Sequence, residues 1–301
     1  MENILFSEKL KALYNAICQE GIPLSIKFQI IKIEEMAEGV TGHCQLINKP
    51  DEELYINIKI REDRINEEVI SHELLHAKCI KNGYNGGISC IESNSPIEKI
   101  GSSLSNTLEH MMVYQEQDFL NIRRNSSKIL EQMLALDFSE KHDLQSILNA
   151  LAIFESKVRG GENYEELAIK IQKKYPIAYT IALEIFELIN IEKLKTAFQF
   201  RRELIKVLKY LETIELTESQ IHTIPFTKLV AIGFIPSARQ LSQSVNQIFE
   251  VTYNYFNTNY IALTSRSEEQ LSFFIYPTSE SVKDLTLDDL FHKMRHIYMV
   301  R

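Results

Sequence analysis

The sequence predicts an α+β protein, and three observations lead to this fold class. Short segments rich in isoleucine, valine and tyrosine occur near the amino terminus, with partial period-two alternation that is typical of strands. A helical pattern runs almost without interruption over residues 126–216. Strand-forming segments return beyond Pro225, and a last helix closes the chain. At 301 residues, two or three domains are expected.

Composition excludes several broad classes of protein. Hydrophobic residues make up 45% and charged residues 25%, which is ordinary for a folded globular chain. The net charge of −8 provides no positive field for a phosphate backbone, so we expect no nucleic-acid partner. Four irregularly spaced cysteines indicate free thiols rather than a disulfide framework. No secretory signal or long apolar run appears, so we expect a cytoplasmic protein without a membrane span.

The amino-terminal part is expected to hold a helix, a small sheet and two further helices. The predicted strands cover residues 23–33, 39–48 and 53–60. A helical period follows from about residue 65 to 81, with acids in its first turn, lysines near its end and Asn82-Gly83 as the stop. A linker containing glycine and proline precedes another helix over about 97–121.

The later chain divides into a helical part and a mixed part. Within the helical part we expect a turn at 159–163 and a boundary at Pro176. The last part contains three strand-like segments and a helix that Thr286 caps. We therefore predict three domains, over residues 1–125, 126–216 and 217–301, the last of them a small α+β domain.

One motif indicates chemistry: His72-Glu73-Leu74-Leu75-His76, an HExxH sequence inside a predicted helix. A spacing of four residues puts both imidazoles on one helical face, where both can bind one Zn²⁺. Glu73 lies beside that face and can take a proton from metal-bound water as general base. A catalytic zinc site of this kind has three protein ligands, so a third is needed.

Two neighbouring residues are candidates for the third ligand. Glu109 follows His76 by 33 residues, in a helix whose apolar positions give it a buried side. A carboxylate at the edge of a core needs a partner or a metal, which makes Glu109 the first candidate. His110 is the second candidate. Asn106, one turn earlier, could instead pair with His110 beside the metal.

At these residues the chain resembles the zincin-like HExxH metallopeptidases, and the gluzincin branch more than any other. A metzincin would continue as HExxHxxGxxH, but Cys79 and Asn82 stand at the glycine and histidine positions. The ImmA/IrrE-like peptidases are the nearest architectural relatives. The resemblance covers roughly residues 1–125 and depends on His72, Glu73, His76 and Glu109, and it implies a zincin-like domain in which an edge strand holds the substrate.

The resemblance also has limits in this sequence. Nothing matches the NExxSD-like continuation of thermolysin-type enzymes, because Val113 stands four residues after Glu109. Tyr84 and Tyr114 could each donate a hydrogen bond to an oxyanion, but the abundance of tyrosine favours a packing role for both.

The sequence therefore predicts a zinc metallopeptidase that acts on a protein or peptide substrate, with Glu73 as base. The competing interpretation is a regulatory or sensor protein that binds a metal or partner with little or no turnover. Its appeal is that residues 126–301, more than half of the chain, lie outside the peptidase-like part. We expect these residues to select the target, or to bind a regulatory protein partner, rather than to contribute to the chemistry.

Overall fold

The computed structural model is of the α+β class, as predicted, and its described residues pack as two compact units. The first unit comprises residues 1–84 and 111–125, and the second comprises 85–110 and 126–301. The strands of the described residues form two three-stranded sheets and one two-stranded sheet. The structure describes residues 7–37, 39–49, 52–84, 88–122, 128–136, 140–161, 163–217, 223–276, 281–296 and 298–301.

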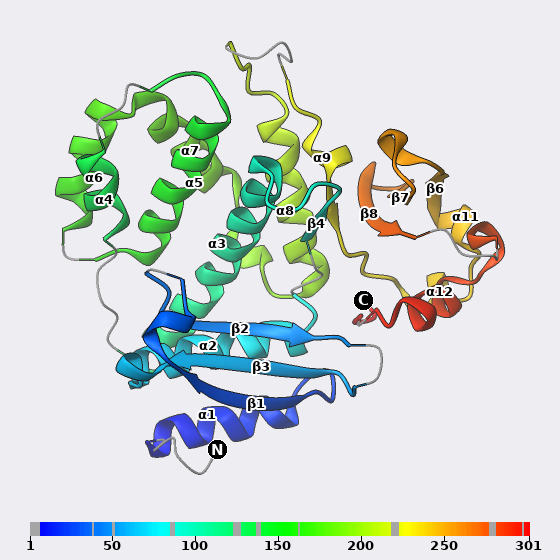
Figure 1. Cartoon of the computed structure of the whole chain (residues 1–301), viewed down its shortest axis with the longest axis horizontal. Coiled ribbons are helices and arrows are strands. Elements are labelled where there is room, and N and C mark those ends of the chain that lie inside the picture. The colour runs from blue at the N-terminus through cyan, green and yellow to red at the C-terminus, as the bar shows by residue number, and fades with distance from the viewer. Residues whose placement is uncertain are drawn as a thin grey trace. The chain divides into compact units, whose positions relative to one another are not determined.

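The first unit contains the predicted amino-terminal sheet (Figure 1). Its strands are β1 (Ser25–Ile31), β2 (Gly42–Ile47) and β3 (Tyr55–Arg61). The central strand β3 runs parallel to β1 and antiparallel to β2, which gives the order β1-β3-β2. The three predicted strands are therefore present, and β2 lies at one edge of the sheet.

Alternation along β3 creates the core of this unit. Ile56, Ile58 and Ile60 are fully buried, and the residues between them are partly exposed. The helix α2 (Glu67–Lys81) packs against β2, β3 and the first helix, α1 (Glu8–Gln19).

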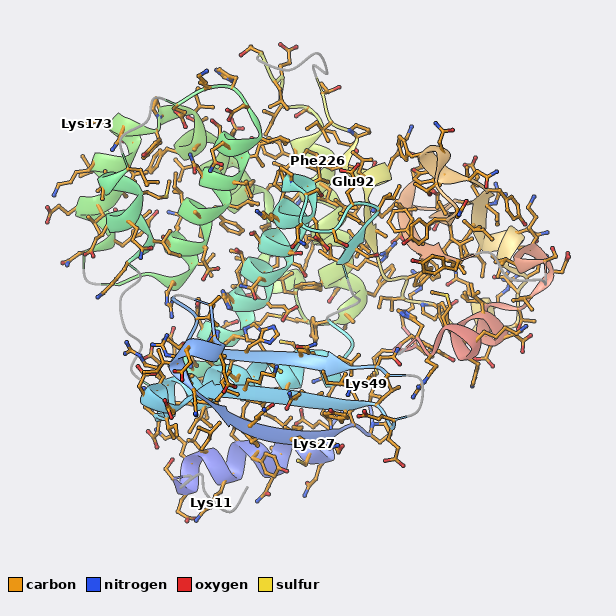
Figure 2. All side chains as sticks on the ribbon, viewed as in Figure 1. Lys11, Lys27, Lys49, Glu92, Lys173 and Phe226 are labelled. Atoms are coloured by element: carbon orange, nitrogen blue, oxygen red, sulfur yellow. The ribbon has the colours of Figure 1, made fainter. Side chains whose placement is uncertain are left out.

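Two lysines of the first unit illustrate how long side chains are accommodated. Lys81 is buried, and its Nζ donates a hydrogen bond to the carbonyl oxygen of Cys18, 3.2 Å away. Lys27, labelled in Figure 2, places its Nζ 3.7 Å from the centre of the Tyr55 ring. Each ammonium group therefore contacts a partner within the first unit.

The long helix α3 (Pro96–Phe119) belongs to both units. Its residues up to His110 pack in the second unit, and those from Met111 onward pack in the first. Leu104 and Leu108 are fully buried, as the sequence pattern predicted. His110 and Met111 are consecutive in one uninterrupted helix, so the helix itself fixes the direction of each relative to the other.

The second unit contains a group of helices. Asp143 caps α5 by accepting a hydrogen bond from the backbone of Ser146, and Gly160 ends it with a φ of +67°. Pro176 begins a helix as predicted, because its missing N–H costs nothing in a first turn. The helices are α4 (Ile129–Ala135), α5 (Leu144–Arg159), α6 (Tyr164–Lys174), α7 (Pro176–Leu188) and α8 (Ala197–Leu211).

The carboxy-terminal part of the second unit is a small sheet with short helices. Thr286 caps the last helix as predicted, accepting a hydrogen bond from Asp289. The strands are β6 (Phe249–Thr252), β7 (Ile261–Ser265) and β8 (Gln270–Ile275), all antiparallel. The helices are α9 (Phe226–Leu229), α10 (Ala238–Leu241), α11 (Val245–Ile248) and α12 (Leu287–Met294).

The sequence did not predict the pairing of β4 (Ile88–Cys90) with β5 (Val230–Ile232). This two-stranded sheet joins the expected linker to a segment about 140 positions later in the chain. Single-turn 3-10 helices lie at Ile33–Glu35, Glu62–Arg64, Ile191–Lys193 and Val282–Asp284, and a further turn at Tyr255–Asn257 contains a non-helical residue, Phe256.

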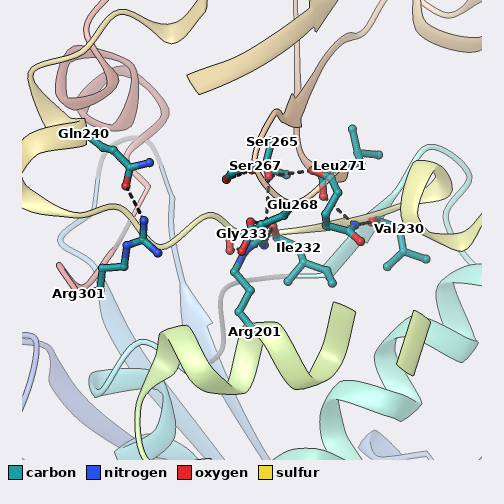
Figure 3. A network of polar contacts seen from close by, with 12 residues as sticks. Arg201, Val230, Ile232, Gly233, Gln240, Ser265, Ser267, Glu268, Leu271 and Arg301 are labelled. Carbon is teal, nitrogen blue, oxygen red and sulfur yellow. Dashed lines mark hydrogen bonds and ion pairs between the residues drawn. The ribbon is translucent and has the colours of Figure 1, made fainter. Parts of the chain in front are cut away.

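A buried arginine fastens α8 to the carboxy-terminal sheet (Figure 3). The side chain of Arg201 is 2% exposed, and its Nη2 lies 2.8 Å from a carboxylate oxygen of Glu268. The same guanidinium donates to the carbonyl oxygens of Ile232 and Gly233 and to the hydroxyl of Ser272. Each contact joins α8 to a segment that is distant in sequence, so the network ties the helical and mixed parts of the second unit together.

The described cysteines Cys18, Cys44, Cys79 and Cys90 form no disulfide. None of the helices in the described ranges combines the length with the apolar run that a membrane crossing needs. The three-domain division predicted from sequence and the cytoplasmic location stay predictions.

Candidate metal centre

The helix α2 presents the HExxH residues because of its local sequence. Asn66 caps its first turn by accepting a hydrogen bond of 2.9 Å from the backbone of Val69. Acidic residues occupy the first turn and lysines the last, which suits the helix dipole. Asn82 caps the end of the helix, and Gly83 follows it. The φ of Gly83 is +75°, a value that residues with a side chain rarely adopt.

His72 and His76 lie on the same face of α2. Their Nε2 atoms are 3.2 Å apart. Two nitrogens bound to one zinc at 2.0–2.1 Å with a tetrahedral angle are separated by about 3.3 to 3.4 Å, so the observed distance is close to that of a shared ion. His76 is 8% exposed, whereas His72 is partly exposed.

A third histidine completes the cluster. Each of His72, His76 and His110 offers one ring nitrogen, and these three nitrogens lie within 4.8 Å of one another. These three form the group of metal-ligating side chains found among the described residues. Glu109, the first candidate for the third ligand, is buried but is not a member of this group. Of the two candidates, the structure brings His110 together with the HExxH histidines.

Contacts within the first unit hold α3 against α2 near the cluster. Gln117 Nε2 donates to the hydroxyl of Ser71 at 2.9 Å and to the carbonyl oxygen of Glu68 at 3.0 Å. Lys78 and Glu116 form an ion pair of 2.6 Å. These contacts fix the turns of α3 that follow His110.

Tyr114 lies one turn after His110 and is 3% exposed. Its ring stacks on the ring of His72, with centroids 5.6 Å apart and an angle of 28° between the planes. This stacking restricts the rotation of the His72 ring. The structure thus gives Tyr114 a packing contact at the cluster, and Tyr84 lies partly buried at the end of α2.

Glu73 is 5% exposed. Burial raises its pKa to about 7, while the charge of His76 opposes the rise. A carboxyl group with a pKa near neutrality exchanges a proton readily at neutral pH, which suits a general base.

The edge strand β2 approaches Glu73 closely. A Cβ atom added to Gly42 would lie 2.6 Å from Glu73 Oε1, well inside van der Waals contact. Only glycine therefore fits here without displacing the carboxyl group. Nothing in the sequence pattern singled out Gly42, because the contact joins residues 31 positions apart.

Glu155 of α5 is a second residue that sequence reasoning missed. Its Oε1 lies 2.7 Å from Nδ1 of His110, and the two side chains are 13% and 10% exposed. The motif gave no sign of this contact, because the two residues are 45 positions apart in the chain. Glu155 also belongs to the helical part, which was expected to take no part in the chemistry.

The fold and the cluster define an α+β protein with three histidines beside a buried glutamate. The Orthopoxvirus A47 protein family matches residues 57–247, more than half of the chain. The chain therefore belongs to the Orthopoxvirus A47 protein family. Comparison with curated proteins and with solved structures gives no match.

This family assignment overturns the resemblance to the zincin-like metallopeptidases, including the gluzincin branch and the ImmA/IrrE-like peptidases. That resemblance depended on four residues within 1–125, and HExxH is short enough to occur outside that class of enzymes. The family match instead runs across the predicted boundary at residue 125 and includes the helical part. The gluzincin assignment also depended on Glu109, which lies outside the histidine group.

Proposed function

We propose that this protein is a zinc-dependent hydrolase that cleaves peptide bonds, with His72, His76 and His110 as metal ligands and Glu73 as general base. The observation that carries the proposal is the convergence of three imidazoles within 4.8 Å, next to a buried carboxyl group on the same helix. The proposal rests on these side chains, not on membership of any known peptidase family.

The donor set favours zinc over the harder cations. Imidazole nitrogens suit zinc and its transition-metal neighbours, whereas magnesium and calcium prefer oxygen ligands. Three protein ligands leave one coordination position for water or substrate. A zinc ion at this cluster would supply an acidic water molecule and a positive charge for the carbonyl oxygen of the substrate.

The residues of the chain provide the remaining functions. Glu73 accepts a proton, and its pKa of about 7 matches that role at neutral pH. Tyr114 limits the rotation of His72 by stacking on its ring. The low exposure of Glu73 and His76 strengthens electrostatic interactions at the cluster, because water screens them less.

The edge strand β2 supports a peptide as the substrate. One edge of β2 pairs with β3, and in the described ranges no strand pairs with its other edge. An extended peptide can add to such an edge through main-chain hydrogen bonds. Gly42 brings this strand within contact distance of Glu73, so a peptide along β2 would run beside the base.

A matched pair of variants tests the proposal. Zinc-loaded full-length protein is incubated with a mixture of short synthetic peptides, and cleavage is read by mass spectrometry. We expect Glu73→Gln to reduce cleavage by at least about 100-fold while zinc content is unchanged, because the amide cannot accept the proton. His72→Ala should lose both zinc and cleavage.

Two results would contradict the proposal. Cleavage that persists in Glu73→Gln would show that another group is the base. Zinc binding by the wild-type protein without any cleavage would instead support the competing regulatory or sensor function.

A further inference from the structure

The contact between His110 and Glu155 joins two titratable side chains that are almost fully covered. The distance from His110 Nδ1 to Glu155 Oε1 is 2.7 Å, typical of a strong hydrogen bond to a carboxylate. The two residues are 45 positions apart in the chain: His110 belongs to α3 and Glu155 to α5. Burying a carboxylate costs free energy unless it is paired, so this contact is a specific one.

The contact with Glu155 favours one tautomer of the His110 ring. A carboxylate accepts hydrogen bonds, so the contact with Glu155 puts the ring proton on Nδ1. The side-chain amide of Asn106 lies farther away, with its Nδ2 3.5 Å from His110 Nε2, at the outer limit of a hydrogen bond. The contact with Glu155 leaves the lone pair on Nε2, which is the form that a metal ligand needs.

We propose that Glu155 is a positioning residue of the metal centre. It orients the ring of His110 and keeps the proton on Nδ1, so that Nε2 is left to bind the ion. Carboxylates that bind the second nitrogen of a metal-ligating histidine act in this way. This inference rests on the proposed function, since it assigns Glu155 to the same site.

The consequence is a different role for the helical part of the chain. Two ligands come from α2, but the third would depend on a carboxylate of α5. Residues 126–301 would then contribute to the centre itself and not only to target selection. The region that matches the family, residues 57–247, includes both His110 and Glu155.

The first test measures zinc affinity by competition with a chromophoric chelator, using the full-length protein. We expect Glu155→Ala to weaken zinc binding by about 10- to 100-fold. Glu155→Gln should recover part of this loss, because its amide oxygen can still accept the hydrogen bond from Nδ1. Glu268→Ala is the matched control: it removes a buried carboxylate from an ion pair in the same unit, and zinc affinity should be unchanged.

The results separate this inference from the proposed function. If Glu155→Ala binds zinc as tightly as wild type while His110→Ala does not, the role of Glu155 is refuted and the three-histidine centre stands. An equal loss in Glu155→Ala and Glu268→Ala would show general destabilisation and would also refute it. If wild type and His72→Ala bind zinc equally, both the centre and the role of Glu155 are refuted.

A second measurement needs no variant of Glu155 and so does not depend on its folding. Nitrogen-15 spectra of histidine-labelled, zinc-free wild-type protein report which ring nitrogen carries the proton, and His110→Gln assigns the signal. We expect the Nδ1–H form for His110. The Nε2–H form would overturn the proposal.

Discussion

Gly42 is the residue that most directly constrains Glu73, the proposed base. A methyl group at this position would meet the carboxyl group of Glu73 at 2.6 Å, so we expect Gly42→Ala to displace Glu73. The φ of Gly42 is not positive, so the backbone of β2 accommodates alanine at this position. Peptide cleavage should fall by at least about 10-fold, since a small displacement of a catalytic group is costly. Zinc binding should stay within about twofold of wild type, because the three histidines are not touched.

Gln45→Ala is the control for this prediction. Gln45 is an exposed residue of the same strand, so its replacement changes β2 without crowding Glu73. Equal activity of Gly42→Ala and wild type would show that Glu73 is not needed in its observed position.

His296 supplies a pH-dependent contribution to stability. Its ring lies 4.9 Å from the ring of Phe273 and 4.8 Å from that of Phe291, and burial lowers its pKa from 6.5 to about 4. As pH falls, the unfolded state binds a proton near pH 6.5, before the folded state does. The stabilisation is therefore full above pH 6.5 and is lost between pH 6.5 and 4, by at most about 3 kcal/mol.

Urea unfolding at several pH values tests this dependence. The free energy of unfolding of wild type should fall more steeply below pH 6.5 than that of His296→Phe, which cannot bind the proton. Parallel pH profiles for the two proteins would contradict the assignment.

The sequence predicted some residues of the candidate site and could not predict others. The spacing of His72, Glu73 and His76 along one helix is a local property, so the motif alone placed these side chains together. His110 was one of two candidates, because neighbouring helical residues point about 100° apart and the orientation of α3 was unknown. Glu155 depends on how two helices pack, which a single sequence does not reveal.

Arg201 determines how α8 is attached to the carboxy-terminal sheet. Burial lowers the pKa of its guanidinium, and the carboxylate of Glu268 opposes this shift. Glu268→Ala leaves the buried charge without its carboxylate, so the free energy of unfolding should fall by about 3 to 5 kcal/mol. Chemical denaturation of the full-length chain measures the change.

An exposed ion pair provides the comparison. Glu166 and Lys170 lie one helical turn apart on the surface of α6, 2.5 Å from each other. Water screens this pair, so Glu166→Ala should lower the free energy of unfolding far less than Glu268→Ala does. A similar cost for Glu166→Ala and Glu268→Ala would show that burial adds nothing to the Arg201 contact.

Elements with strong local signals were predicted, and those with weak signals were not. Strand-forming residues run from Phe249 to Phe256, in one of the three strand-like segments expected after Pro225, but β6 ends at Thr252. Asn254, Phe256 and Asn257 all have positive φ, which a strand excludes. The strands β4 and β5 have three residues each and stabilise one another, so neither gives a recognisable pattern alone.

The whole chain is better described by its family than by its motif. HExxH predicted the cluster, but it suggested a peptidase domain that ends near residue 125. The family match continues to residue 247, through the helices that provide Glu155. Hydrophobic period distinguishes helix from strand, whereas the grouping of elements depends on contacts between distant residues. For this reason α3, which belongs to both units, was assigned from sequence to the first domain alone.

A crystal of the zinc-loaded full-length protein, measured on both sides of the zinc absorption edge, tests the metal centre most directly. The account predicts one anomalous peak per chain, within about 2.0 to 2.1 Å of a ring nitrogen from each of His72, His76 and His110. A peak bound by Glu109 in place of His110, a peak at another site, or no peak at the three histidines would contradict it.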